Sequence, residues 1–308
     1  MNIVDLHCDT ISRLCNTGES LWENTGHFDI KRAVKSNMAV QFFSLFAMPS
    51  DWNTALRQIL KQLDRFYQEF ELNSDYLYLL KKYSDIEKSE NKKKIGCVLH
   101  LEGAEALGTD MEILRLLHLL GLRSLGLTWN ARNQFADGVG EGDEAGGLSL
   151  KGREILQEMS RMKIMLDLSH ISRKAFFEAL EHYDKPVIAS HSNARTVCDH
   201  RRNLDDTQLR ALAAHGGVIG VNQVSYFISE NEGTLDDIVR HIAYIADLIG
   251  IEHVALGSDF DGAESTIMKG VEDYLVWEEL LERKGFSRQE IEMVLGGNAF
   301  RVMEAVLR

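Results

Sequence analysis

The sequence has few of the residues that break or cross-link a chain. Only two prolines and four cysteines occur among its 308 residues, and the cysteines form no CxxC pair. Scattered cysteines favour reduced thiols, so we expect a cytoplasmic protein. No apolar run approaches the ~18 residues of a membrane span, and no basic segment followed by an apolar one opens the chain. We therefore expect neither a transmembrane helix nor a signal peptide.

An excess of basic residues is also lacking. The chain has 34 lysines and arginines against 47 aspartates and glutamates, which gives a formal net charge of -13 at pH 7. An acidic surface repels phosphate backbones, so we expect no nucleic-acid partner. The hydrophobic fraction of 44% and the charged fraction of 26% are typical of a globular protein.

What the sequence does contain is a regular alternation of short apolar runs and longer segments with helical periodicity. Eight short runs predict strands, at residues 2–6, 38–46, 95–101, 122–128, 163–168, 186–189, 217–221 and 253–256. Several are apolar almost throughout, as strands covered on both faces are. Strands that alternate with helices predict a parallel sheet with crossover helices.

The segments between these runs predict helices. They span residues 51–82, which is long enough for two helices, 111–120, 150–162, 173–182, 205–214 and 235–249. Capping pairs mark three helix starts: Asp205 with Gln208, Thr234 with Asp237, and Ser287 with Glu290. A glycine pair at 296–297 interrupts the last helical segment before it resumes at 298–307.

We therefore predict an α/β fold, a single (β/α)8 (TIM) barrel domain over residues 1–308, with helical insertions and C-terminal helices. An open doubly wound sheet is the alternative, but the glycine fingerprint expected after its first strand is missing. The glycine-rich acidic stretch 138–147 predicts a surface loop. Because it follows the fourth strand, on the side where barrels carry their active sites, a lid over the site is the other interpretation.

Four histidines are followed two positions later by a carboxylate: His7/Asp9, His27/Asp29, His100/Glu102 and His182/Asp184. This spacing places both groups on one face of a strand, as joint metal binding requires, but it does not choose among the four pairs. The position of each pair relative to the ends of the predicted strands does distinguish them. The carboxyl ends of barrel strands converge on one mouth. Six ionisable residues stand at predicted strand ends: His7, Asp9, Glu102, His170, His191 and Asp259.

Any one histidine at a strand end is more simply explained as a polar cap. Six ionisable groups gathered at one mouth without a metal would carry a large desolvation cost, so we predict a metal site. Mixed imidazole and carboxylate ligands suit Zn2+ first, with Mn2+ or Co2+ as alternatives. We expect His100, on the same strand face as Glu102, to orient the ligands.

The other histidines suggest no chemistry. We expect the pair His27/Asp29 in a surface loop and the pair His182/Asp184 at an exposed helix end. The positions of four more predict structural roles: His118, His215 and His241 in helices, and His253 at the start of the last strand.

At this point the residues show a family resemblance. The segments that carry it are DLHCD (5–9), LEG (101–103), DLSH (167–170), SHSNA (190–194), RRNLDD (201–206), DFDG (259–262) and GNAFRV (297–302). In this order, over almost the whole chain, they resemble the membrane (renal) dipeptidase family of zinc metallopeptidases, in a bacterial-type soluble form.

The resemblance implies a (β/α)8 metal-dependent hydrolase with two Zn2+ ions. It implies that His7 and Asp9 hold one ion, that His170 and His191 hold the other, and that Glu102 bridges them. The implied reaction is hydrolysis of dipeptides, including those with a C-terminal D-residue, by a metal-bridging hydroxide. Two further residues receive implied roles: Arg202 binds the substrate's C-terminal carboxylate, and Asp259 transfers protons.

Two positions depart from the family pattern. Trp129 stands where better-known members carry a histidine that contacts the substrate and stabilises the tetrahedral intermediate. An indole N–H donates one hydrogen bond but is never cationic, so we expect a shifted specificity rather than loss of activity. A substrate-contacting tyrosine is replaced by Phe227, with Tyr226 adjacent.

Two alternatives stay open. Other amidohydrolase-like barrels (deaminases, lactonases or amidases) usually carry H-x-H after the first strand and a lysine after the fourth, and this sequence has neither. A catalytically inactive metal-binding homologue is the second alternative, because of Trp129. We expect small dipeptides as binding partners, and a homodimer is compatible with the sequence.

Overall fold

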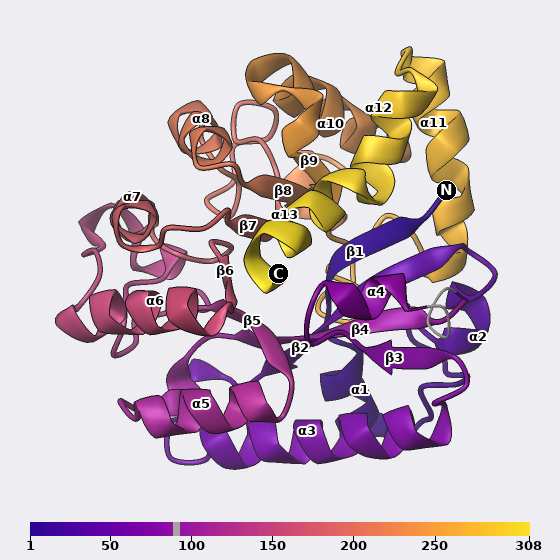
Figure 1. Ribbon diagram of the computed structural model, residues 1–308. Helices are drawn as coiled ribbons and strands as arrows, with labels where there is room; N and C mark the ends of the chain where they lie inside the picture. Colours follow the sequence, from indigo (N-terminus) through magenta and orange to yellow (C-terminus); the bar gives the residue numbers. More distant parts are fainter. Residues whose placement is uncertain (89–92) are drawn as a thin grey trace.

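Eight parallel strands close into a barrel in the part of the chain that the computed structural model describes, residues 1–88 and 93–308 (Figure 1). The barrel strands are β1 (Ile3–Cys8), β2 (Met38–Phe46), β4 (Ile95–Glu102), β5 (Leu122–Gly126), β6 (Met165–Asp167), β7 (Ile188–Ser192), β8 (Val218–Val221) and β9 (Val254–Leu256). β2 pairs with both β1 and β4, and this pairing closes the ring. The predicted barrel is confirmed.

Helices surround the strands. The longer ones are α1 (Thr10–Thr17), α3 (Ala55–Leu72), α5 (Met111–Leu119), α6 (Leu150–Met162), α7 (Arg173–His182), α8 (Asp206–Ala214), α10 (Leu235–Ile249), α11 (Trp277–Lys284) and α13 (Asn298–Leu307). Short helices complete the fold: α2 (Ile30–Ala33), α4 (Ser84–Glu87), α9 (Ser225–Ile228) and α12 (Arg288–Glu292). In Figure 1 the helices α3, α5, α6, α7, α8 and α10 form an outer ring, while α13 crosses one end of the barrel.

Two apolar cores explain this arrangement. The larger core fills the space between the strands and the outer helices. The smaller one lies inside the barrel, where Val4, Val40 and Met165 pack with Val302 and Val306 of α13. α13 covers the end of the barrel where the strands begin, and the interior at that end is apolar. The polar side chains inside the barrel lie towards the opposite end, where the strands finish.

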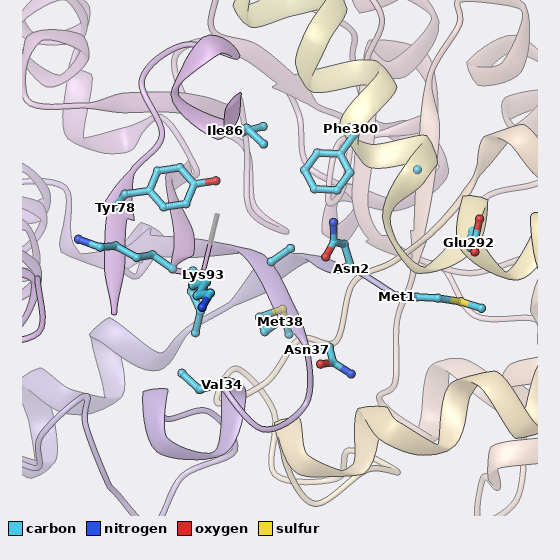
Figure 2. Close-up of a pocket in the computed structure, with 14 residues that line it drawn as sticks. Met1, Asn2, Val34, Asn37, Met38, Tyr78, Ile86, Lys93, Glu292 and Phe300 are labelled. Atoms are coloured by element: carbon cyan, nitrogen blue, oxygen red, sulfur yellow. The ribbon is translucent and has the colours of Figure 1, made fainter. Parts of the chain in front are cut away.

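A large cavity of about 710 Å³ lies at this sealed end (Figure 2). Its walls include Asn2 and Met38 at the start of β1 and β2, and Phe300 of α13. None of the predicted ligand residues lines it. Catalysis in such barrels takes place at the carboxyl ends of the strands, so this cavity is not the expected active site.

The predicted helix boundaries agree closely with the structure. The ranges 150–162, 173–182 and 235–249 are reproduced as α6, α7 and α10. All three capping boxes form, at the N-termini of α8, α10 and α12. The glycine pair at 296–297 does not break the C-terminal helix, because Met293–Gly297 forms a π-helical turn that joins α12 to α13.

The prediction of two helices over 51–82 was wrong. α3 ends at Leu72, and Leu77–Leu79 forms β3, which pairs with β4 between Ile95 and Cys97. From Leu99 onward, the same edge of β4 pairs with β5 instead of β3. β3 therefore adds an edge strand outside the closed ring, and the helical periodicity of the preceding residues hid it.

Several strand ends also differ from the prediction. β1 and β7 are longer than expected, so His7 and His191 lie inside strands rather than after them. β5 stops at Gly126. Lys163 does not open β6 but caps α6 in a left-handed conformation, with φ 57°. His253 ends a 3-10 turn just before β9.

Candidate active site

Five side chains with metal-ligand chemistry meet at the mouth opposite α13. They come from β1 and the residue after it, the end of β4, the segment after β6, and β7: His7, Asp9, Glu102, His170 and His191. All five are buried. The sequence-based expectation that these distant residues converge on one opening agrees with the structure.

Glu102 lies at the centre of this cluster. Its Oε2 is 3.4 Å from Nε2 of His7, and its Oε1 is 2.9 Å from Nε2 of His170 and 3.7 Å from Nε2 of His191. The Nε2 of His7 is also 3.2 Å from Oδ2 of Asp9. Each carboxylate oxygen of Glu102 therefore faces a different pair of potential ligands.

The donor set fits bound cations. The Nε2 atoms of His170 and His191 converge to 2.8 Å. Burial, assisted by the positive charge of Arg202, lowers the pKa of both imidazoles, so they are neutral, the form that binds a metal. Burial and the charge of Glu102 raise the pKa of Asp9, a repulsion that a cation between the two carboxylates would relieve.

Buried hydrogen bonds fix the outer atoms of these ligands. Ser44 donates to Oε2 of Glu102 at 3.0 Å. The side-chain oxygen of Asn130 lies 2.9 Å from Nδ1 of His170, and the hydroxyl of Ser190 lies 2.7 Å from Nδ1 of His191. Sequence reasoning assigned no role to these partners. For Asn130 and Ser190 a signal was present, since Asn130 follows the family position Trp129 and Ser190 opens the segment SHSNA (190–194).

His100 lies beneath the cluster, as expected from its position on β4. Its Nδ1 is 2.9 Å from the hydroxyl of Ser124, and its Nε2 is 3.4 Å from Oδ2 of Asp167. Asp167 also accepts a hydrogen bond from the hydroxyl of Ser190, which links this buried layer to His191. Burial lowers the pKa of His100 to about 4, so its ring is neutral.

Asp259 lies at the rim of the same mouth, on a strained turn after β9. Its backbone has φ 62°, and that of Asp261 has φ 64°. Non-glycine residues rarely adopt this region, and such strain is concentrated at functional sites. Potential ligand atoms of Asp259, His7 and His191 lie within 4.8 Å of one another. The Asp259 carboxylate is thus within reach of a group held by the cluster.

Arg202 brings a buried positive charge to the mouth. Only 5% of the residue is exposed, and burial lowers its pKa. Its Nη2 donates to the carbonyl oxygen of His191 at 3.2 Å, while its Nε has no hydrogen-bond partner among the described residues. It also makes no ion pair with a described carboxylate. A buried guanidinium without a counterion can bind a ligand carboxylate through two parallel hydrogen bonds.

Aromatic side chains form the remaining wall of a cavity of about 230 Å³ over the cluster. Trp129 lies between Phe46 and His170, with ring centroids 5.5 Å and 5.9 Å away. Tyr226 is half exposed, whereas Phe227 is buried with its ring 5.6 Å from the guanidinium carbon of Arg202. The cavity lies below the usual range for drug-sized ligands, roughly 300–1,000 Å³, and suits a small substrate.

The glycine-rich loop 138–147 is tied to the site by its backbone. Val139 donates a backbone hydrogen bond to His170, and Gly140 donates one to Asn130, both at 2.7 Å. A Cβ at Gly138 would lie 2.3 Å from the carbonyl oxygen of Trp129. The glycines therefore permit close packing against residues 129 and 130, and the loop is part of the wall that holds Asn130.

One of the two pairs expected at the surface is not there. His182 ends α7 and Asp184 is exposed, as expected. His27 does lie in a loop, but its Nδ1 accepts a 2.9 Å hydrogen bond from the backbone N–H of Asp261. Asp29 is buried and caps α2. The surface interpretation of this pair was wrong, because Asp29 holds the first turn of α2 and His27 holds the backbone of the distant Asp261.

The four histidines predicted to be structural lie outside the cavity. His118 lies in α5 and His241 is buried in α10. His215 caps the end of α8 rather than lying in it. The Nδ1 of His253 donates a hydrogen bond of 2.7 Å to the carbonyl oxygen of Gly217.

Comparison with known proteins agrees with this geometry. The sequence matches the membrane dipeptidase family (peptidase family M19) over residues 1–308. The chain belongs to this family. It is therefore a metallopeptidase of the dipeptidase class.

Relatives and solved structures show the same relationship. The chain is 35% identical over 301 residues to the uncharacterized dipeptidase C965.12 of Schizosaccharomyces pombe, covering 90% of this chain and 72% of that protein. It is 31% identical over 296 residues to the dipeptidase tcpJ of Claviceps purpurea, covering 91% and 69%. A metallopeptidase from Rhodobacter sphaeroides, solved with a phosphinate mimic of L-Ala-D-Ala, superposes with a TM-score of 0.93 at 27% identity, over 99% of each chain.

Proposed function

We propose that this protein hydrolyses the peptide bond of dipeptides with two Zn2+ ions held by the five clustered ligands. The observation that carries the proposal is the position of Glu102, whose two carboxylate oxygens face different histidines. A carboxylate in this position suits a bridge between two cations. His7 and Asp9 would hold one ion, and His170 and His191 the other. Mn2+ or Co2+ could occupy the same ligands.

Bound metal ions of this kind lower the pKa of a water molecule and polarise the scissile carbonyl. The chain's own residues do the rest. Asp259 accepts a proton from the attacking water and returns it to the leaving amine, a transfer that its place at the rim permits. Arg202 binds the substrate's terminal carboxylate. With this anchor fixed and the cavity small, a longer peptide would not fit.

Trp129 lines the same cavity, and its indole N–H can donate one hydrogen bond to the substrate. The relative from Rhodobacter sphaeroides binds a mimic of L-Ala-D-Ala, which favours acceptance of C-terminal D-residues by this chain as well. None of the helices in residues 1–88 and 93–308 has the length and apolar character that a membrane-spanning helix needs. We propose a cytoplasmic enzyme.

Metal analysis combined with a dipeptide panel tests the proposal. Purified protein should contain close to two zinc equivalents and release amino acids from dipeptides with L- and D-residues at the C-terminus. Chelation should abolish the activity, and added Zn2+ should restore it. If metal-loaded protein hydrolyses no dipeptide, and Asp259→Asn behaves in the same way, the protein is an inactive metal-binding homologue.

A further inference from the structure

A second, smaller cavity of about 130 Å³ lies beside the candidate active site. His170 and Arg202 line both cavities, so the two share a wall. The rest of the smaller cavity is built by the start of α7, by the segment between β7 and α8, and by Val139 and Gly142 of the glycine-rich loop.

The lining of this cavity is strongly basic. Among the residues that the structure describes, no aspartate or glutamate lines it, whereas four arginines do: Arg173, Arg195, Arg201 and Arg202. We call this set the arginine pocket. Its charge contrasts with the formal net charge of -13 of the whole chain. A local positive potential in an acidic protein attracts small anions to one place.

Two of the four arginines have carboxylate partners outside the lining. Arg173 pairs with Asp205 at 2.6 Å, and Arg195 pairs with Asp199 at 2.7 Å. Arg201 and Arg202 form no ion pair with any residue in the described part of the chain. The pocket therefore retains two positive charges that lack a direct counterion.

The backbone adds to this potential. Ser172 caps α7, a helix of ten residues, and its hydroxyl accepts a hydrogen bond from the backbone N–H of Ala175. Ser172 and Arg173 both line the pocket, which places the positive end of this helix at its wall. Independently, the Nε of the buried Arg202 has no hydrogen-bond partner within residues 1–88 and 93–308.

We propose that the arginine pocket is an anion subsite that binds a second carboxylate, the side-chain carboxylate of an acidic C-terminal residue in a dipeptide. This inference rests on the proposed function, in which Arg202 holds the terminal carboxylate, so that the C-terminal residue lies next to the pocket. A free oxyanion has the same chemistry and is the other source of such a ligand.

Because Arg202 would pair with the terminal carboxylate, the physical basis of selection is the cost of leaving Arg201 without a partner. A dipeptide ending in asparagine matches one ending in aspartate in size but presents a neutral amide. An arginine that faces an amide loses a charge-assisted hydrogen bond, and sites built around such bonds discriminate strongly against neutral analogues.

The first test compares Ala-Asp with Ala-Asn. The ratio of their kcat/KM values should favour the acidic dipeptide in the wild-type protein. Arg201→Gln should lower this ratio about five- to tenfold, the loss expected for one partly exposed charge-assisted hydrogen bond. Arg57→Gln makes the same charge change on α3, away from both cavities, and should leave the ratio at its wild-type value.

The second test measures binding without turnover. Calorimetry with inorganic phosphate on the zinc-loaded protein should show an affinity that falls about fivefold in Arg201→Gln and not in Arg57→Gln. Phosphate binding that depends on Arg201, without a preference for Ala-Asp, would support the subsite and assign it to a free anion. Equal results for wild type and Arg201→Gln in both tests would overturn it. If no dipeptide is hydrolysed, the proposed function has failed, and calorimetry alone decides on the pocket.

Discussion

Asn222 donates a hydrogen bond of 3.0 Å from its Nδ2 to Oδ2 of Asp259. The amide is itself fixed, because its Oδ1 accepts from the backbone N–H of Val224 at 2.6 Å and its backbone N–H donates to Asn193. The other carboxylate oxygen of Asp259 lies above Gly262, where an added Cβ would come within 2.5 Å of it. One oxygen of Asp259 is thus anchored while the other remains available to carry a proton.

The first prediction concerns this proton carrier. Asp259→Asn keeps the shape and the anchoring by Asn222 but removes the base. We expect kcat to fall about 10²- to 10⁴-fold, the usual contribution of general acid–base catalysis, with KM changed little. Steady-state kinetics and metal analysis of the same preparations check this. A variant with wild-type kcat and a full metal load would assign the proton transfer to another group.

The second prediction concerns the bridging position. Glu102→Gln keeps the volume of the side chain but replaces one of the two carboxylates of the cluster with a neutral amide. Because Glu102 faces both histidine pairs, we expect this variant to lose metal from both. Mass spectrometry of the metal content should give well under one equivalent, against about two in the wild type. His182→Gln, at the end of α7, is the matched control and should keep its metal.

The assembly of the cluster from distant segments could be predicted from the sequence, because barrel topology constrains where strand ends lie. Once alternating strands and helices predicted a barrel, every residue at the carboxyl end of a strand was assigned to one mouth. This worked for His7, Glu102 and His191 even though β1 and β7 run further than predicted. An error of one or two residues at a strand end does not move a side chain to the other end of the barrel.

What sequence reasoning missed depends on contacts that no periodicity encodes. Asn222 and Ser44 act through single hydrogen bonds to Asp259 and Glu102, and their partners are distant along the chain. β3 was missed because three residues are too few to show a strand period beside a long helix. His27 was misjudged for the same reason as Asn222, since its partner Asp261 lies 234 positions away.

The third prediction concerns His27. Its Nδ1 accepts the backbone N–H of Asp261, and its own backbone N–H donates to that residue's carboxylate at 2.8 Å. These bonds hold the turn that carries Asp259. We expect His27→Ala to lower kcat about tenfold, the cost of leaving one partly buried backbone donor unpaired, with little effect on KM.

His27→Asn is the matched variant, because its side-chain oxygen can replace the Nδ1 acceptor. It should recover most of the lost kcat. Thermal melting of both variants separates loss of folding from loss of positioning. Equal kcat values for wild type, His27→Ala and His27→Asn would show that the turn holds Asp259 without His27.

The fourth prediction concerns acid stability and a residue outside the site. Burial lowers the pKa of His241 to about 4 in the folded protein, from an ordinary value of 6.5. Between these values the unfolded chain binds a proton that the folded chain does not. The stability contributed by neutral His241 is therefore complete above pH 6.5 and is lost as the pH falls towards 4, by about 2 kcal/mol at pH 5.

Urea unfolding at pH 7.5, 6 and 5, in the presence of a chelator, measures this effect without protonation of bound metal ligands. His241→Gln should be less stable than the wild type at pH 7.5, because it loses one of the two hydrogen bonds that His241 makes to Ala194 and Ile228. Its free energy of unfolding should depend less steeply on pH. Parallel pH profiles for the two proteins would exclude His241 as the source of the acid sensitivity.

The fifth prediction separates two roles of Trp129, which borders the cavity beside Phe46 and His170. If the indole N–H stabilises negative charge on the substrate oxygen during reaction, Trp129→Phe deletes that donor and keeps the aromatic wall. We expect kcat to fall roughly 10- to 100-fold with KM nearly constant, because the lost bond forms mainly in the transition state.

Trp129→His complements this variant. An imidazole supplies an N–H donor that becomes cationic when protonated, as indole cannot. We expect it to exceed Trp129→Phe in kcat and to show a new acid-side dependence of kcat. If Trp129→Phe retains wild-type kcat while KM rises, the indole serves as an apolar wall, and charge on the substrate oxygen must be stabilised by the metal ions and Arg202 instead.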